Sequence, residues 1–185
     1  PEIWLSYVKP EEFYEKAKIY LEKVFDMMGV NDHNIILDQL LLPQNVHRID
    51  NYFDSNLKAF VVARDPRDVF IINKYIWPSK NESVPFSTDV KEFCKQYRLL
   101  REMERRTDSD KVLYIRFEDL IYNYDESVKN ISTFLGLSEE AHVRKKEKFK
   151  PELSINNTQL FRANDQYRKE GKLIAELLPE YIYDF

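Results

Sequence analysis

The sequence predicts an α/β protein with a parallel sheet flanked by helices in three layers. Short apolar runs alternate along the chain with segments of helical periodicity. Residues 57–63 form the clearest run, rich in valine and phenylalanine and apolar at every position from Ala59 onward. Such continuous runs are typical of strands that helices cover on both faces of a parallel sheet. The alternation of strands with helices favours the same parallel topology.

The helices are predicted from apolar residues that recur every three or four positions, and from the residues that end them. Gly29 and Gly136 each follow such a pattern and are typical residues for a helix end. The predicted helices cover residues 10–28, 66–77, 88–106, 124–135, 138–149 and 164–178. The predicted strands cover residues 35–37, 57–63 and 111–117, and an ordered loop without periodicity is expected over 151–162. At 185 residues, the chain is long enough for one domain over residues 1–185.

Composition and charge argue against several classes of protein. The net charge of −4 is unlike that of a general nucleic-acid binder, which is usually basic. The single cysteine, Cys94, excludes an internal disulfide and a zinc site built on several cysteines, so no metal is expected. No apolar run approaches the roughly 20 residues that span a bilayer, and no signal peptide is visible, although the chain opens on Pro1. We therefore expect a cytoplasmic protein that binds neither nucleic acid nor membrane.

A phosphate site is predicted where the strand over residues 57–63 gives way to a helix. Asp65 suits the N-cap, Pro66 suits the first helical position, and Asp68 stands where an acid completes a capping box. The start of a helix favours a bound phosphate through its backbone N–H groups and dipole. Arg64 adds a guanidinium that can contact phosphate with two donors. The alternative is a capped surface helix whose two arginines form ion pairs, because such caps are common.

Three segments resemble the sulfotransferase family in order and spacing. Residues 60–70, Phe-Val-Val-Ala-Arg-Asp-Pro-Arg-Asp-Val-Phe, are similar to the family's strand and helix that bind the 3′-phosphate of 3′-phosphoadenosine 5′-phosphosulfate. Residues 112–120 resemble its strand ending in aromatic-Glu-Asp-Leu, and residues 128–137 resemble its helix closing in Phe-Leu-Gly. The resemblance covers about residues 57–137, with weaker support to about 162. It implies the phosphate-loop NTPase-like sulfotransferase fold, in partial form.

The resemblance implies a set of cofactor contacts. Arg64 would bind the 3′-phosphate, and Arg67 holds the basic position of the same motif. The family's serine partner, eight residues beyond the arginine, falls on Ile72 here. Asn73 stands next to it as a candidate donor, although one residue along a helix turns a side chain by about 100 degrees.

A later loop is also implied to contact the cofactor. Residues 149–158 resemble the family's loop that folds over the nucleotide, and Lys150 and Arg162 are the charged residues expected to reach a phosphate when that loop closes. Glu118 and Asp119, by contrast, are interpreted as structural residues. The basic residues of 144–150 either face an acidic acceptor or form a solvated helix face balanced by neighbouring glutamates; we favour the second reading.

Two parts of a sulfuryl-transfer site have no clear counterpart. No glycine opens a phosphate loop, so that loop is expected to lie upstream of Pro1 or to be absent. Leu41 stands where many family members have a histidine before Leu-Pro. Asp38, at the end of the predicted strand over 35–37, is our first candidate for the catalytic base, ahead of His47. An isolated Asp or His is more often a cap or a solvated residue.

Three functions remain open from the sequence. The first is a sulfotransferase that moves a sulfuryl group from 3′-phosphoadenosine 5′-phosphosulfate to a hydroxyl or amine of a small-molecule or carbohydrate acceptor. The second is a catalytically silent module that keeps only the 3′-phosphate site. The third is a relative of the nucleoside kinases, which the aromatic-Glu-Asp-Leu strand disfavours. The acceptor and the oligomeric state are not encoded in any motif we recognise.

Overall fold

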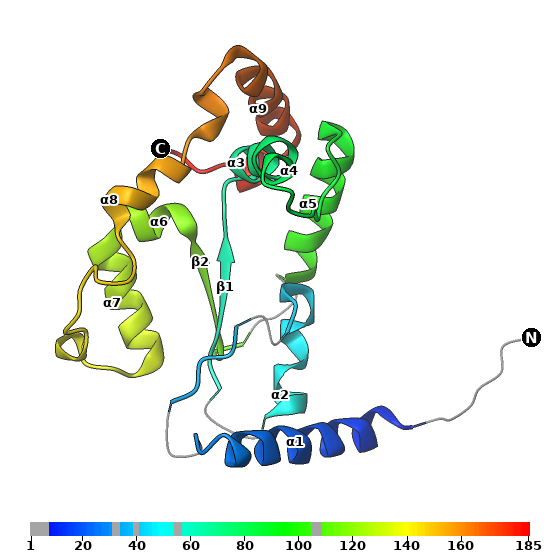
Figure 1. The fold of residues 1–185 in the computed structure, drawn as a ribbon, viewed down its shortest axis with the longest axis vertical. Helices are drawn as coiled ribbons and strands as arrows, with labels where there is room; N and C mark the ends of the chain where they lie inside the picture. Colours follow the sequence, from blue (N-terminus) through cyan, green and yellow to red (C-terminus); the bar gives the residue numbers. More distant parts are fainter. Residues whose placement is uncertain (1–7, 31–33, 39–40, 54–56, 105–108) are drawn as a thin grey trace, which may run out of the picture. The chain divides into compact units, whose positions relative to one another are not determined.

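The computed structural model describes residues 8–30, 34–38, 41–53, 57–104 and 109–185. It divides into two compact units, residues 1–57 and 58–185. The first unit contains helix α1 (Pro10–Met27), the 3₁₀-helix η1 (Pro43–Arg48) and helix α2 (Ile49–Tyr52) (Figure 1). The expectation of one domain over the whole chain is left untested by this division. In the described part of the chain, no helix combines the length and the apolar character that a bilayer span requires.

Unit 1 confirms one predicted helix and corrects one predicted strand. Helix α1 has Pro10 at its first position, and Gly29 follows its end with a positive φ of 65°. The strand expected over residues 35–37 is absent: the segment has no regular secondary structure, and Ile36 is 95 % exposed. Three residues form a stable strand only beside a neighbouring strand, and no described residue provides a ladder partner for them.

Unit 2 carries the remaining elements, and its strands and longer helices follow the predicted order. They are β1 (Ala59–Ala63), α3 (Pro66–Ile71), η2 (Ile72–Ile76), α4 (Trp77–Ser79), α5 (Val90–Glu104), β2 (Val112–Arg116), α6 (Phe117–Tyr122), α7 (Tyr124–Leu135), η3 (Glu139–Ala141), α8 (Pro151–Ser154), η4 (Ile155–Asn157), η5 (Leu160–Arg162), α9 (Asp165–Leu177) and η6 (Pro179–Tyr181). The helix expected over 138–149 is wrong, because only the short η3 forms there. The segment is rich in charge and leaves Val143 82 % exposed, so it has no buried apolar face to hold a helix.

The two strands form a parallel pair, which confirms the α/β class. Ala59 pairs with Val112 and Ala63 pairs with Arg116, so both strands end at the same edge. Figure 1 shows that both then lead directly into helices, β1 into α3 and β2 into α6. Val61 is buried, whereas Phe60 and Val62 are 40 % and 52 % exposed. The described residues therefore cover the two faces of β1 unequally, and the three-layer, phosphate-loop-like architecture stays a prediction.

The core of unit 2 lies among α3, α5 and α9 rather than around the strands. Phe70 of α3 and Phe93 of α5 are fully buried, and their ring centroids are 5.0 Å apart in an edge-to-face arrangement. Ile174 of α9 is also fully buried in this cluster. The other buried members are Ile71, Val90, Cys94, Tyr97, Phe161, Leu178 and Tyr181. The helix that follows β1 is thus part of a packed core of three helices, α3, α5 and α9.

The helix that follows β1 changes its winding at η2, a π-helix between α3 and α4. Two successive residues of η2 bind one carboxylate of α9. Lys74 forms an ion pair with Glu170 at 2.7 Å, and the Tyr75 hydroxyl donates to the same side chain at 2.9 Å. Glu170 is only 7 % exposed, so a largely buried carboxylate with two donors links η2 to α9.

Gly171 lets α9 approach η5 closely. A Cβ atom at this position would lie 3.0 Å from the Cβ of Phe161. The helical penalty of about 1 kcal/mol that glycine carries is therefore offset by a contact that no larger residue permits without displacement. This contact fixes the segment around Phe161 on the core.

Candidate functional site

The predicted helix start at the end of β1 is confirmed. The Asp65 side chain accepts the backbone N–H of Arg67 at 2.8 Å, and Pro66 stands at the first helical position. Asp65 is fully buried. Its own N–H donates to the carboxylate of Glu118 at 2.7 Å, which ties the end of β1 to α6. The local sequence therefore folds as its capping pattern predicts, and α6, which follows β2 directly, supplies the second carboxylate at this edge.

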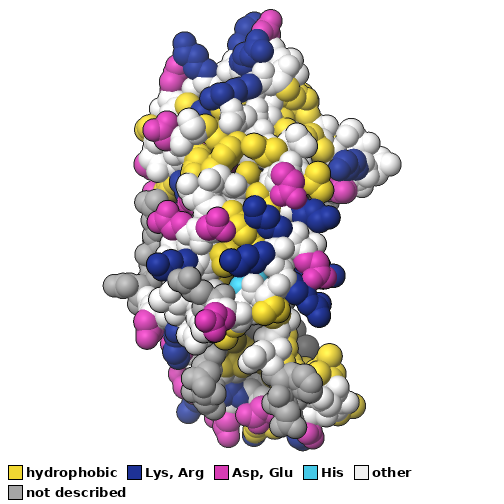
Figure 2. Space-filling view, turned by 90° about the vertical axis from the view of Figure 1, so that its left-hand side faces the viewer, with side chains coloured by type: hydrophobic (Ala, Val, Ile, Leu, Met, Phe, Trp, Pro, Cys, Tyr) yellow, Lys and Arg dark blue, Asp and Glu magenta, His cyan; other side chains and the backbone are white. Residues whose placement is uncertain are grey.

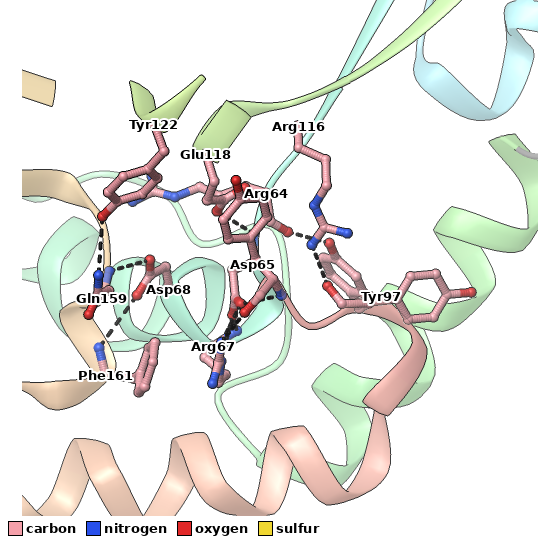
Figure 3. A network of polar contacts seen from close by, with 12 residues as sticks. Arg64, Asp65, Arg67, Asp68, Tyr97, Arg116, Glu118, Tyr122, Gln159 and Phe161 are labelled. Carbon is pink, nitrogen blue, oxygen red and sulfur yellow. Dashed lines mark hydrogen bonds and ion pairs between the residues drawn. The ribbon is translucent and has the colours of Figure 1, made fainter. Parts of the chain in front are cut away.

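Asp65 also holds Arg67, so this arginine has structural partners. The Arg67 guanidinium donates to both carboxylate oxygens of Asp65, at 2.9 Å and 2.7 Å. It donates to the Tyr183 carbonyl at 3.0 Å and lies 4.0 Å above the ring centroid of Phe161. Figure 3 shows Arg67 beside Asp65 within this network. For Arg67, the structure therefore agrees with the alternative reading of the sequence, in which the arginine forms an ion pair instead of binding phosphate.

Arg64 lies in a different environment. Its guanidinium is 4.8 Å from the ring centroid of Phe117, and Nη2 donates to the carbonyl of Asn157. Its buried Nε has no hydrogen-bond partner among the described residues. Burial lowers the pKa of Arg64, against the nearby carboxylates of Asp68 and Glu118, but an arginine remains charged at neutral pH. Arg64 is therefore a cation whose guanidinium is held by Phe117 and Asn157 and whose Nε–H has no acceptor among the described residues.

Asp68 departs from the capping box that the sequence predicts. Its carboxylate is fully buried and accepts the backbone N–H of Gln159 at 2.8 Å and that of Phe161 at 3.4 Å, across 91 and 93 residues of chain (Figure 3). Burial raises the pKa of Asp68 to about 6, partly opposed by Arg64. Since Asp65 accepts the Arg67 N–H, this donor of the helix start is already occupied.

We expect the raised pKa of Asp68 to appear as a pH-dependent stability. Its folded pKa of about 6 lies above the ordinary value of 3.8, so the folded state binds the proton more tightly. The stabilising effect of that proton is complete below about pH 4 and is lost as the pH rises through about 6. Asp68→Asn keeps the shape but does not titrate. The free energy of unfolding of wild type, minus that of Asp68→Asn, should fall by about 2 kcal/mol between about pH 4 and 7.

Chemical denaturation of both proteins at several pH values measures this difference. Titrations of groups that do not interact with Asp68 affect both proteins equally and cancel in the subtraction. A difference that stays constant, or that rises with pH, would contradict the assignment of the raised pKa to Asp68. Glu118, whose pKa burial also raises, is present in both proteins.

Residues without a motif complete the site. The Tyr97 hydroxyl donates to the Arg64 carbonyl at 2.6 Å, and the Arg116 guanidinium donates to the Tyr181 carbonyl at 2.5 Å. Tyr183 donates through its hydroxyl to Asp119 at 2.8 Å. Helical periodicity placed Tyr97 on the buried face of its helix, but no sequence signal connected Arg116 or Tyr183 with the end of β1.

The contacts of the other predicted cofactor residues, Asn73, Lys150 and Arg162, do not include Arg64. Asn73 is fully buried, accepts the Phe86 N–H at 3.1 Å and donates to the Phe86 carbonyl at 3.0 Å, so it clamps the loop before α5. Lys150 is exposed at the N-cap of α8. Arg162 is exposed and lies 5.5 Å from the ring centroid of Phe161. Asp38 is an exposed residue in unit 1, and its supporting strand is missing.

The surface shows no large area of one charge in the view of Figure 2. Dark-blue basic and magenta acidic side chains alternate across this face. Within residues 144–150, Arg144 lies 3.7 Å from Glu147 in an exposed ion pair. This exposed pair agrees with a solvated segment balanced by glutamates, but the helix face of that reading is wrong, because only η3 forms over residues 138–149.

The comparison with known families decides the class of protein. A model of the sulfotransferase domain matches residues 41–173 of the chain. This chain belongs to the sulfotransferase family. The match includes Arg64, the Asp65 cap and the segment around Gln159, but Asp38 and Tyr183 lie outside it. Neither the search of curated proteins nor that of solved structures found a match. The family resemblance of the three motifs is thereby confirmed for this sulfotransferase chain.

Proposed function

We propose that this chain binds 3′-phosphoadenosine 5′-phosphosulfate and acts in sulfuryl transfer to a hydroxyl or amine of a small-molecule or carbohydrate acceptor. Membership of the sulfotransferase family supports transfer of a sulfuryl group in general. The observation that carries the proposal further is the spare donor of Arg64. Its buried Nε has no hydrogen-bond partner among the described residues, and Arg64 directly follows β1 at the carboxyl edge of the strands, where ligands of parallel sheets bind.

The contacts of Arg64 suit a phosphate. The Asn157 carbonyl occupies one donor of Nη2, which has a second hydrogen, so Nε and Nη2 together can donate to two phosphate oxygens. The Phe117 ring supports the plane of the guanidinium. A buried guanidinium without a full set of acceptors has a high cost, and an anion removes that cost. The 3′-phosphate is the anion that this motif takes in the family it resembles.

The proposed reaction places separate demands on the chain. The acceptor oxygen or nitrogen attacks sulfur, the bond from sulfur to the 5′-phosphate oxygen breaks, and the acceptor proton passes to a base. Asp38 is our candidate for that base. Lys150 and Arg162 are candidates for neutralising charge on the phosphosulfate, since both are exposed and long enough to adjust. These three roles rest on the sequence motifs rather than on observed contacts.

Nucleotide titration tests the proposal. Wild-type protein is titrated calorimetrically with 3′,5′-adenosine bisphosphate and, as a matched control ligand, with adenosine 5′-monophosphate. Because only the first carries a 3′-phosphate, we expect it to bind at least about ten-fold more tightly. Equal affinities would overturn the 3′-phosphate site. Incubation with sulfur-labelled donor and a panel of acceptors then separates a sulfotransferase from a silent module, which binds the bisphosphate and transfers nothing.

A further inference from the structure

Residues 182–185 lie directly on the site just described. The Tyr183 N–H donates to Asp65 at 2.9 Å, and its carbonyl accepts from Arg67 at 3.0 Å. Its hydroxyl donates to Asp119 at 2.8 Å, and burial with this hydrogen bond raises the pKa of Tyr183 to about 12. One residue therefore bridges the N-terminal end of α3 and α6. We call residues 182–185 the strap.

The strap packs its aromatic rings on Tyr122 of α6. The Tyr183 ring stacks on Tyr122 with centroids 6.2 Å apart and an angle of 23°. Phe185 meets the same ring edge-on at 5.7 Å. It also lies 6.3 Å from Phe161 of η5. Tyr122 thus packs against both strap rings, whose centroids lie 5.1 Å from each other, and this cluster restricts the direction of its hydroxyl.

Tyr122 in turn holds the segment that contacts Arg64. Its hydroxyl lies 2.6 Å from the Thr158 hydroxyl and accepts the Gln159 side-chain amide at 3.1 Å (Figure 3). The residue before Thr158 is Asn157, whose carbonyl accepts from Arg64. A continuous set of contacts therefore runs from the strap through Tyr122 and residues 157–159 to the Arg64 guanidinium.

We propose that the strap is a positioning element of the phosphate site, with Tyr183 and Phe185 as its positioning residues. It fixes Tyr122, and through Tyr122 it keeps the Asn157 carbonyl in place to orient Arg64. The strap lies beyond residue 173, where the family match ends. Its effect on ligand binding rests on the proposed function, whereas its hold on residues 157–161 does not.

Two measurements on strap variants test the inference. Tyr183→Ala removes both the stacking ring and the hydroxyl, whereas Tyr183→Phe keeps the ring. Asp184→Ala changes an exposed strap residue and is the control. In Tyr183→Ala we expect hydrogen exchange of the Gln159 and Phe161 amides to rise at least about ten-fold. We also expect bisphosphate affinity to fall about five-fold, the value of one well-placed hydrogen bond. Tyr183→Phe and Asp184→Ala should stay within about two-fold of wild type.

The outcomes distinguish a positioning role of the strap from a purely stabilising hydrophobic contact. They also distinguish a failure of this inference from a failure of the proposed function. If the strap only stabilises the fold, Tyr183→Ala will lower the melting temperature and will raise the exchange rates of the Gln159 and Phe161 amides no more than those of core amides. That result would overturn the positioning role of the strap. Faster exchange with unchanged bisphosphate affinity would overturn its role in positioning Arg64. If Tyr183→Ala does not fold, Phe185→Ala, which loses a 37 % exposed ring, takes its place. If wild type binds no bisphosphate, the proposed function fails, while the exchange experiment still decides whether the strap holds residues 157–161.

Discussion

Arg64→Ala should weaken binding of 3′,5′-adenosine bisphosphate by about thirty-fold or more. The expected loss is that of two charge-assisted hydrogen bonds from a guanidinium that is already oriented, or about 2 kcal/mol. Orientation matters because the Phe117 ring and the Asn157 carbonyl hold the group before the ligand arrives. Little ordering entropy is then lost on binding. Calorimetric titration of wild type and variant measures the ratio of dissociation constants.

Two further variants make this prediction specific. Arg64→Lys keeps the charge but loses the planar fork, so we expect an intermediate affinity. Lys95→Ala removes one positive charge from an exposed ion pair with Glu92 and should leave the affinity within about two-fold of wild type. Equal affinities for wild type and Arg64→Ala would remove Arg64 from the site. Equal losses in Arg64→Ala and Lys95→Ala would indicate a general charge effect.

Phe93→Ala is expected to be the most destabilising single change discussed, at about 3–5 kcal/mol. Phe93 is fully buried and packs edge-to-face on Phe70 at 5.0 Å and on Phe86 at 5.5 Å. Its ring also lies 5.7 Å from Tyr97. Alanine leaves a cavity between α3 and α5, because the aromatic neighbours cannot all relax into it. Urea denaturation followed by circular dichroism measures the free energy of unfolding.

Leu99→Ala is the matched control on the same helix. Leu99 is 56 % exposed, so its truncation should change the free energy of unfolding by no more than about 0.5 kcal/mol. If Phe93→Ala and Leu99→Ala were equally stable, the core would not lie where the structure puts it. Because the Tyr97 hydroxyl donates to the Arg64 carbonyl, a displacement of Tyr97 in Phe93→Ala should also displace the backbone of Arg64.

Local chemistry explains what the sequence could predict. The strand over 57–63 and the cap at Asp65 could be predicted from short stretches of sequence, because strand propensity and capping depend on residues that are close together in the chain. The αL end at Gly136, with φ of 70°, follows from the same kind of rule. The parallel pairing of β1 with β2 was accessible from the alternation of elements.

The remaining contacts of the site join residues far apart in the chain. Asp68 looked like a capping residue, yet its carboxylate finds better donors in the backbone of Gln159 and Phe161 once the chain folds. Asn73 was a candidate donor to phosphate, but burial directs its amide to Phe86. The helix expected over 138–149 failed because periodicity without a neighbour to pack against does not hold a helix. Sequence patterns indicate which face of a helix or strand is buried, but they do not identify the distant residues that pack against that face.

The π-helical turn at η2 restricts how this chain can change length. Lys74 and Tyr75 both meet Glu170 because η2 winds more slowly than an α-helix. Loss of one residue there would return the turn to α-helical hydrogen bonding and change the directions in which Lys74 and Tyr75 leave the helix, away from that carboxylate. The exposed turn around Asn81 has no such phase to keep. Insertions and deletions that accumulate over evolutionary time should therefore be confined to that turn, while η2 keeps its length.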